Sequence, residues 1–157
     1  MFLVEKVGSS ESLELIAAAI TEAKKIKKPI DIAICGPEGE LISFVRMDGA
    51  NPASAQIAQR KAYTSARDCK STRDQGEFMR SANREQGYWA DRNITGFGGG
   101  VPIIQNSKVI GGIAISGLSE EEDERIARHA ISIVLTYNKK DLLKKQAFFY
   151  ESNVMRT

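Results

Sequence analysis

The sequence has few of the residues that cross-link a small protein or bind metal ions. It contains two cysteines, Cys35 and Cys69, and one histidine, His129, in 157 residues. Because the two cysteines are far apart and form no CxxC pair, we expect two reduced thiols rather than a disulfide framework. A single histidine cannot build a multi-histidine metal site or a Ser-His-Asp triad in the usual way. We therefore predict no metal site.

Long apolar runs and a large excess of one charge are also missing. No apolar stretch approaches the roughly 20 residues that span a bilayer, and Glu5 interrupts the N-terminus too early for a secretory signal. We therefore expect a cytoplasmic protein without a membrane partner. Lysine and arginine number 22 against 20 acidic residues, a net charge of +2. Because bases and acids are interleaved along the chain, we expect no nucleic-acid partner.

The composition is that of an ordinary globular domain, with 42% hydrophobic and 27% charged residues. Three places carry the signals of a helix start. They are Asn51 followed by Pro52, the capping pattern of Thr72 with Gln75, and Ser119. Hairpins imply antiparallel strands, and helices between them imply a sheet with helices packed on its faces. The apolar spacing predicts, in order, a helix at 12–26, strands at 30–35 and 41–46, helices between 51 and 91, strands at 101–105 and 108–116, and a last helix from 119.

A glycine-rich stretch at 96–100 is the first candidate for ligand binding. Glycines let a backbone approach a ligand, and successive N–H groups can form an anion-binding concavity. The stretch matches neither a dinucleotide fingerprint nor a Walker loop, however, and a purely structural turn explains it equally well. Arg46 and Asp48 end the first hairpin, and Lys61 lies on the next helix. An arginine and a lysine brought near these glycines would suit a ligand carboxylate or phosphate.

Two further features have both a functional and a structural interpretation. The acidic run 120–124 could bind a cation, but acidic residues are also favoured in the first turn of a helix by its dipole. His129 could act as an axial ligand or a general base. Its spacing from Ile126 and Ile133 instead favours a histidine at the edge of a packed helix face.

Five motifs follow one another along the chain: Val45–Ala50, Ala58–Ala66, Gly98–Ile103, Val109–Gly117 and Asp123–Ala127. In this order they resemble the motifs of the GlcG / HbpS / PduO C-terminal domain family, also described as haem-binding or haem-degrading. The similarity runs from about Ser12 to Leu135, so the tail at 138–157 lies outside the family core.

The resemblance implies an α+β fold, with a five-stranded antiparallel sheet flanked by helices in a single profilin-like or PAS-like domain over 1–157. It also implies homo-oligomers. Some members bind haem through a histidine of the N-terminal helix, and the helix expected at 12–26 has none. Another mode uses a hydroxyl group near the Lys-Ala-Tyr-Thr motif. That makes Thr64 the candidate, with Tyr63 as a neighbour. The phenolate of a tyrosine such as Tyr63 can ligate haem iron.

We expect these segments to meet at one hollow, and three functions fit them. The first is binding of a small ligand, either haem or another tetrapyrrole, in an accessory role. The second is an enzyme in which Arg46 and Lys61 hold a small anionic metabolite and Asp48 or Asp123 moves a proton. The third is an oligomeric interaction protein that uses its tail. The predicted binding residues are Arg46, Asp48, Lys61, Tyr63, Thr64, Gly98, Gly99 and Gly100.

Overall fold

A four-stranded antiparallel sheet organises the chain. A computed structural model describes residues 1–136, and the tail predictions for 138–157 lie outside the described residues. The strands are β1 (Asp31–Cys35), β2 (Leu41–Arg46), β3 (Gly100–Gln105) and β4 (Lys108–Ser116). Their order across the sheet is β2-β1-β4-β3, with every neighbouring pair antiparallel. The two predicted hairpins are confirmed, and β1 and β4 form the centre of the sheet.

The five-stranded sheet implied by the family resemblance is wrong for residues 1–136, which form four strands. The N-terminal segment takes the place where a fifth strand could pair. β1 ends at Cys35, opposite Gly112, so the part of β4 that precedes Gly112 has no strand partner on this side. There the Val7 N–H donates to the Ile110 carbonyl at 2.8 Å. This contact docks the segment without extending into a ladder.

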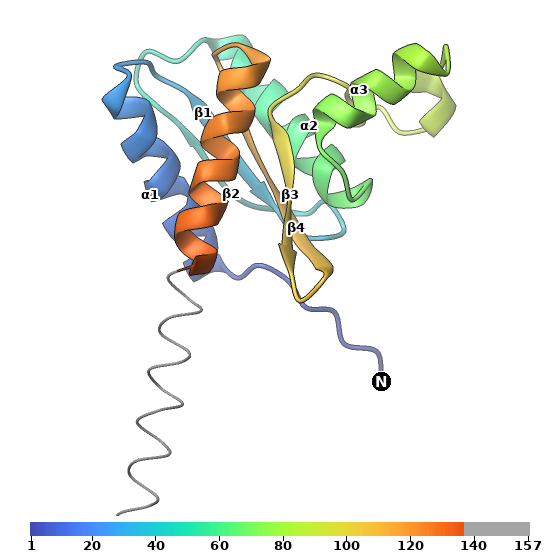
Figure 1. Cartoon of the computed structure of the whole chain (residues 1–157), viewed down its shortest axis with the longest axis horizontal. Helices are drawn as coiled ribbons and strands as arrows, with labels where there is room; N and C mark the ends of the chain where they lie inside the picture. Colours follow the sequence, from blue (N-terminus) through green and yellow to red (C-terminus); the bar gives the residue numbers. More distant parts are fainter. Residues whose placement is uncertain (137–157) are drawn as a thin grey trace, which may run out of the picture.

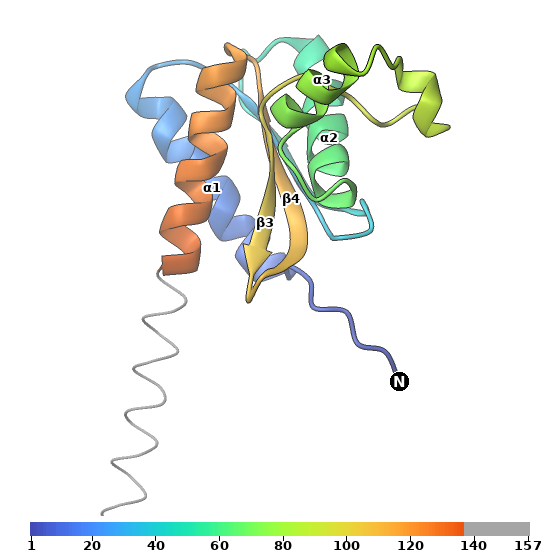
Figure 2. The ribbon, with the colours of Figure 1, turned by 45° about the vertical axis from the view of Figure 1, so that its right-hand side comes forward.

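Two helices cover one face of the sheet. They are α1 (Ser9–Lys25) and the last helix (120–136), which lie side by side in both ribbon views (Figures 1 and 2). Ile32 and Ile34 point to this face because side chains alternate along a strand. The large apolar side chains gather here, with Leu15 and Ile16 from α1 and Ile126 from the last helix.

The other face of the sheet carries α2 (Pro52–Arg67), with α3 (Thr72–Ser81) beyond it (Figure 2). The predicted stripe of small residues lets α2 lie close to the sheet, since Ala58, Ala62 and Ala66 pack on Ala33 and Ala114. A short 3-10 helix, η1 (Gln86–Trp89), follows α3. No helix within residues 1–136 is both long enough and apolar enough to cross a membrane.

The helix starts test the predicted caps. Asn51 is confirmed as the cap of α2, because its side chain accepts a hydrogen bond from the Ala53 N–H with Pro52 in the first turn. The capping box predicted from Thr72 and Gln75 is wrong. Ser71 caps α3 by accepting from the Asp74 N–H, which leaves Thr72 free to turn inward to the glycine-rich stretch.

Candidate functional site

Two cavities flank the exposed side of α2, and Arg60 lines both of them. The first, here called the Phe97 cavity, has a volume of about 310 Å³ and apolar walls formed by Ile57, Met79, Ile94 and Phe97. Gln86 adds a polar group to its lining. The volume is at the lower end of the range, about 300–1,000 Å³, that is usual for small-molecule sites. This cavity therefore suits a mainly apolar ligand that carries an anionic group.

The second cavity, here called the Tyr63 cavity, has a volume of about 250 Å³ and more polar side chains among its lining residues. Amide side chains from Gln56, Gln59 and Asn93 line it together with Tyr63 and the Cys35 thiol. Burial raises the pKa of the Cys35 thiol to about 12, and the charge of Glu40 adds to the effect. Cys35 therefore remains a neutral thiol at physiological pH, which argues against a nucleophilic role.

The phenol of Tyr63 is held in its neutral form. Its hydroxyl donates to Asp91 Oδ2 at 2.7 Å and accepts from Arg67 Nη1 at 2.6 Å. Burial raises the pKa of Tyr63, and the hydrogen bond to Asp91 adds to the effect. The same hydrogen bond lowers the pKa of Asp91. Tyr63 is therefore a poor source of the phenolate that the sequence prediction considered as an iron ligand.

Thr64 is fully buried and uses its hydroxyl within the fold. The hydroxyl donates to the Asn93 carbonyl at 3.3 Å and accepts from the Thr95 N–H at 3.0 Å. Through these two hydrogen bonds, Thr64 connects α2 to the segment that follows η1. That segment supplies Ile94 and Thr95 to the Phe97 cavity, so Thr64 positions a wall of the cavity rather than lining it.

Lys61 is also fully buried and is paired with Asp123 of the last helix. Its ammonium donates to Asp123 Oδ2 at 3.0 Å and to the Ile115 carbonyl at 3.2 Å, while the Leu118 N–H donates to Asp123 Oδ1. Burial lowers the pKa of Lys61 and raises that of Asp123, and the attraction between the two groups opposes both shifts. The charge that was expected to hold an anion is thus already balanced.

Two glycines of the stretch, Gly99 and Gly100, lie against Lys61. A Cβ on Gly99 would come within 2.9 Å of Lys61 Nζ, and one on Gly100 would clash with the Lys61 carbonyl. The stretch does not form an open anion-binding concavity, because two of its N–H groups already have acceptors. The Gly98 N–H donates to Glu120, and the Gly100 N–H donates to the Thr72 hydroxyl. These glycines permit close packing around the ion pair.

Arg46 ends β2, Asp48 lies in the turn that follows, and neither residue lines these two cavities. Arg46 is exposed and donates to the Ala50 carbonyl at 2.8 Å, which closes the turn before α2. The expected single hollow is therefore not formed by either cavity. Binding roles for Arg46 and Asp48 stay predictions.

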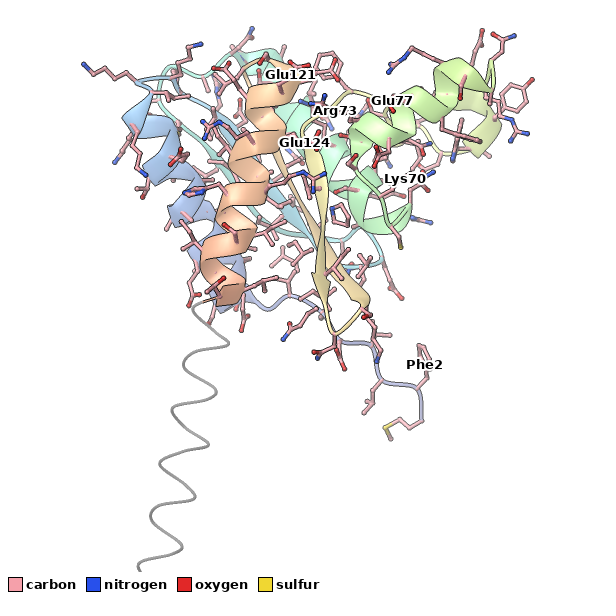
Figure 3. The ribbon with its side chains drawn as sticks, viewed as in Figure 1. Phe2, Lys70, Arg73, Glu77, Glu121 and Glu124 are labelled. Carbon is pink, nitrogen blue, oxygen red and sulfur yellow. The ribbon has the colours of Figure 1, made fainter. Side chains whose placement is uncertain are left out.

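The acidic run at 120–124 makes contacts in several directions. Arg73 of α3 lies between Glu121 and Glu124 of the last helix, at 3.8 and 2.7 Å (Figure 3). Within residues 1–136, no group of three or more His, Cys, Asp or Glu side chains could hold a metal ion.

His129 lies near Glu22 of α1, at 3.4 Å, on the face of the sheet opposite α2. This agrees with a histidine at the edge of a packed helix face.

Sequence reasoning named Lys61 and Asp123 separately and missed that they form a pair. Sixty-two residues separate them, so no local pattern links them. One signal did point to the burial of Lys61: it lies among Ala58, Ala62 and Ser65, on the small-residue side of α2. A lysine in such a position must find a counter-charge, because an unpaired buried charge is strongly unfavourable.

Asp31 is a second buried carboxylate, and its effect on stability should depend on pH. It is fully buried, and neither of its oxygens has a hydrogen-bond partner in the described structure. Burial raises its pKa above 3.8, while Arg46, its neighbour across the β1–β2 pair, opposes the shift. The folded state therefore holds this proton more tightly than the unfolded state, so the contribution of Asp31 becomes unfavourable as pH rises from 3.8.

We therefore expect Asp31→Asn to raise the free energy of unfolding at pH 7, with the gain disappearing below pH 3.8. Urea denaturation at both pH values measures the difference. The exposed variant Asp48→Asn is the control and should change the free energy of unfolding by less than about 0.5 kcal/mol. An equal effect of Asp31→Asn at both pH values would contradict the prediction.

Comparison with known proteins identifies the family. A family model described as "Haem degrading protein HbpS-like" matches residues 8–132. The chain belongs to the HbpS-like family. GlcG of Escherichia coli strain K12 is 31% identical over 102 residues, which cover 65% of this chain and 75% of that protein. The resemblance stated from the five motifs is therefore confirmed.

Solved structures of similar proteins support the fold of this HbpS-like chain. The ORFY protein of Klebsiella pneumoniae matches with a TM-score of 0.78 at 24% identity, over 85% of this chain and 94% of that one. The structure of PduOC in complex with haem matches with a TM-score of 0.74 at 26% identity, over 81% of this chain and 94% of that one. The α+β fold with an antiparallel sheet is thus shared.

The family description raises the question of whether the residues of this chain suit haem. Proteins ligate haem iron with histidine, cysteine thiolate, methionine or tyrosinate. In the two cavities, Cys35 and Tyr63 are held protonated, and His129 lies across the sheet from both. The thioether of Met79 remains, in the wall of the Phe97 cavity. The lining therefore suits an apolar ring edge and a carboxylate better than it suits the iron.

Proposed function

We propose that this HbpS-like protein binds a flat, largely apolar ligand of the tetrapyrrole class, haem among them, at the Phe97 cavity. One observation carries the proposal: four apolar side chains form a hollow of about 310 Å³ with a single guanidinium in its lining. Apolar walls with a few placed polar groups are typical of sites for such ligands. The solved complex of PduOC with haem, at 26% identity, supports the same ligand class.

Each lining residue would have a distinct part in binding. Arg60 is exposed at the boundary of both cavities, where its guanidinium can hold a ligand carboxylate through paired hydrogen bonds. Ile57, Ile94 and Phe97 would cover one side of the macrocycle, and Met79 would offer a thioether. Bound haem would supply iron redox chemistry. Because the cavity is small for a tetrapyrrole, most of the ligand stays outside it and the binding is weak.

A titration of the pure protein with haemin tests the proposal through the Soret band. We expect a saturable spectral change, and about tenfold weaker binding for Arg60→Ala, because a charge-assisted hydrogen bond is lost. Lys24→Ala is the control, since it removes an exposed positive charge from α1 on the other side of the sheet. Absence of saturation would exclude tetrapyrrole binding, and equal weakening by both variants would exclude the role of Arg60.

The accessory role, the homo-oligomer and the cytoplasmic location remain part of this proposal. They derive from the family resemblance and from the composition of the chain. Light scattering of the full chain measures the oligomeric state directly. A monomer at all concentrations would contradict the expected homo-oligomer and leave the ligand proposal standing.

A further inference from the structure

The buried ion pair of Lys61 and Asp123 lies directly behind the Phe97 cavity, and tetrapyrrole binding makes no use of it. Both side chains are removed from solvent, and Lys61 Nζ is 3.0 Å from Asp123 Oδ2. A buried ion pair is poor evidence for stability, because apolar residues of similar size often serve the fold as well or better. The pair also places a desolvated lysine beside a carboxylate that can accept its proton, and desolvation is one way in which a lysine becomes a nucleophile.

The ring of Phe97 stands between this amine and the cavity. Lys61 Nζ is 4.7 Å from the centroid of the ring, in cation–π contact. The same ring lines the Phe97 cavity, and the residue is 49% exposed. The Phe97 ring is therefore in contact with both the Lys61 ammonium and the cavity.

We propose that Phe97 is a gate and that Lys61 forms an imine with a small 2-oxo acid that enters the Phe97 cavity. Arg60 belongs to the same helix, lines the cavity and would hold the carboxylate of the ligand. The carbonyl carbon would then lie toward Phe97 and, once the ring moves, toward Lys61 Nζ. The proposal is independent of tetrapyrrole binding, because neither Lys61 nor Asp123 lines the cavity while Phe97 is in place.

The chemistry balances with the groups present. The Lys61 ammonium first passes a proton to the Asp123 carboxylate, which leaves a neutral amine. The nitrogen lone pair forms a bond to the carbonyl carbon as the C=O π electrons move to oxygen, and one proton of the new C–NH2+ group passes to that oxygen to give a carbinolamine. Asp123 then protonates the hydroxyl group, the C–O bond breaks, and water leaves a protonated imine. In total, one ammonium and one carbonyl give one protonated imine and one water, with no change of oxidation state.

Burial assists both partners in this exchange. It lowers the pKa of Lys61, so the neutral amine is more accessible than in an exposed lysine. It raises the pKa of Asp123, so that carboxylate can hold the transferred proton. Desolvated lysines are the usual amines of imine-forming sites. Exposed lysines, with a pKa near 10.4, are almost fully protonated at pH 7 and react slowly.

Reductive trapping of the full-length protein tests the proposal. The protein is incubated at pH 7 with pyruvate and cyanoborohydride, and peptide mass mapping locates the secondary amine. We expect Lys61 to be labelled before exposed lysines such as Lys108. Phe97→Ala should speed the labelling of Lys61 about tenfold, because the gate and its cation–π contact are both removed. Ile104→Ala, on β3, is the matched control, since Ile104 is also 49% exposed.

Arg60→Ala provides the test of ligand class. It should slow the labelling by pyruvate and leave labelling by the neutral aldehyde propanal unchanged. Label on exposed lysines without label on Lys61, in both the wild-type protein and Phe97→Ala, would overturn the proposal. An unchanged rate in Phe97→Ala would overturn the gate. Both readouts are free of haemin, so a failure here is distinct from a failure of tetrapyrrole binding.

Discussion

Asp123→Leu should lower the free energy of unfolding by about 3–5 kcal/mol, one of the two largest effects that we expect. The variant leaves the Lys61 ammonium buried with the Ile115 carbonyl as its remaining hydrogen-bond acceptor. The lost partner also supplied the attraction that opposed the low pKa of Lys61. The folded state of the variant therefore binds this proton even less tightly, and its stability should rise with pH as the amine becomes neutral.

Replacing both partners should remove most of this loss. We expect Lys61→Met together with Asp123→Leu to unfold within about 1 kcal/mol of the wild-type protein, or to be more stable, because no unpaired charge stays buried. Denaturant unfolding of the wild type, both single variants and the double variant gives the coupling energy of the pair. A double variant as unstable as Asp123→Leu would show that the loss comes from packing rather than from charge.

Gly112→Ala should reduce the free energy of unfolding by about 2–3 kcal/mol, through overpacking between β4 and α2. The new methyl group would lie 2.5 Å from the Ala62 carbonyl and 2.6 Å from Ser65 Oγ. Helix backbone cannot yield as a flexible side chain can, so α2 must move away from the sheet. The backbone of Gly112 does not have the positive φ that favours glycine, so the effect isolates the steric contact.

Gly87→Ala is the control for this experiment. A Cβ on Gly87 would meet no heavy atom within 4 Å, so the change in free energy of unfolding should stay within about 0.5 kcal/mol. Thermal or denaturant unfolding distinguishes the two variants. Equal stability of both would mean that α2 shifts easily. In that case the close contact with β4 does not position Lys61.

Local patterns predicted most of the fold. Alternating apolar residues located both hairpins, and the Asn51–Pro52 pair located the start of α2. The errors concern features that depend on neighbours in space. The fifth strand that the family resemblance implied is absent from residues 1–136, where the N-terminal segment meets β4 through one backbone hydrogen bond of Val7 and an ion pair between Glu5 and Lys108. The cap of α3 was wrong because Thr72 bonds to Gly100 from a distant part of the chain.

The candidate site was predicted less completely than the fold. Gly99 and Gly100 lie beside Lys61 in a packed contact rather than in an open anion site, and the binding roles of these residues stay predictions. Arg60, the cation that both cavities share, was missed. An exposed arginine on a helix surface has no distinguishing pattern in the sequence. Its importance comes from two hollows on either side of α2, which local sequence does not describe.

The amino-acid sequence by itself determined the element types, their order and the family, because hydrophobic periodicity and motif order are local properties of the chain. Only the tertiary structure decided which charges are free. It paired Lys61 with Asp123 and left Arg60 exposed, since packing of the last helix beside α1 brings an acid to Lys61 and, within residues 1–136, none to Arg60. Charge availability depends on distances across the sheet, and those are set by packing rather than by local sequence.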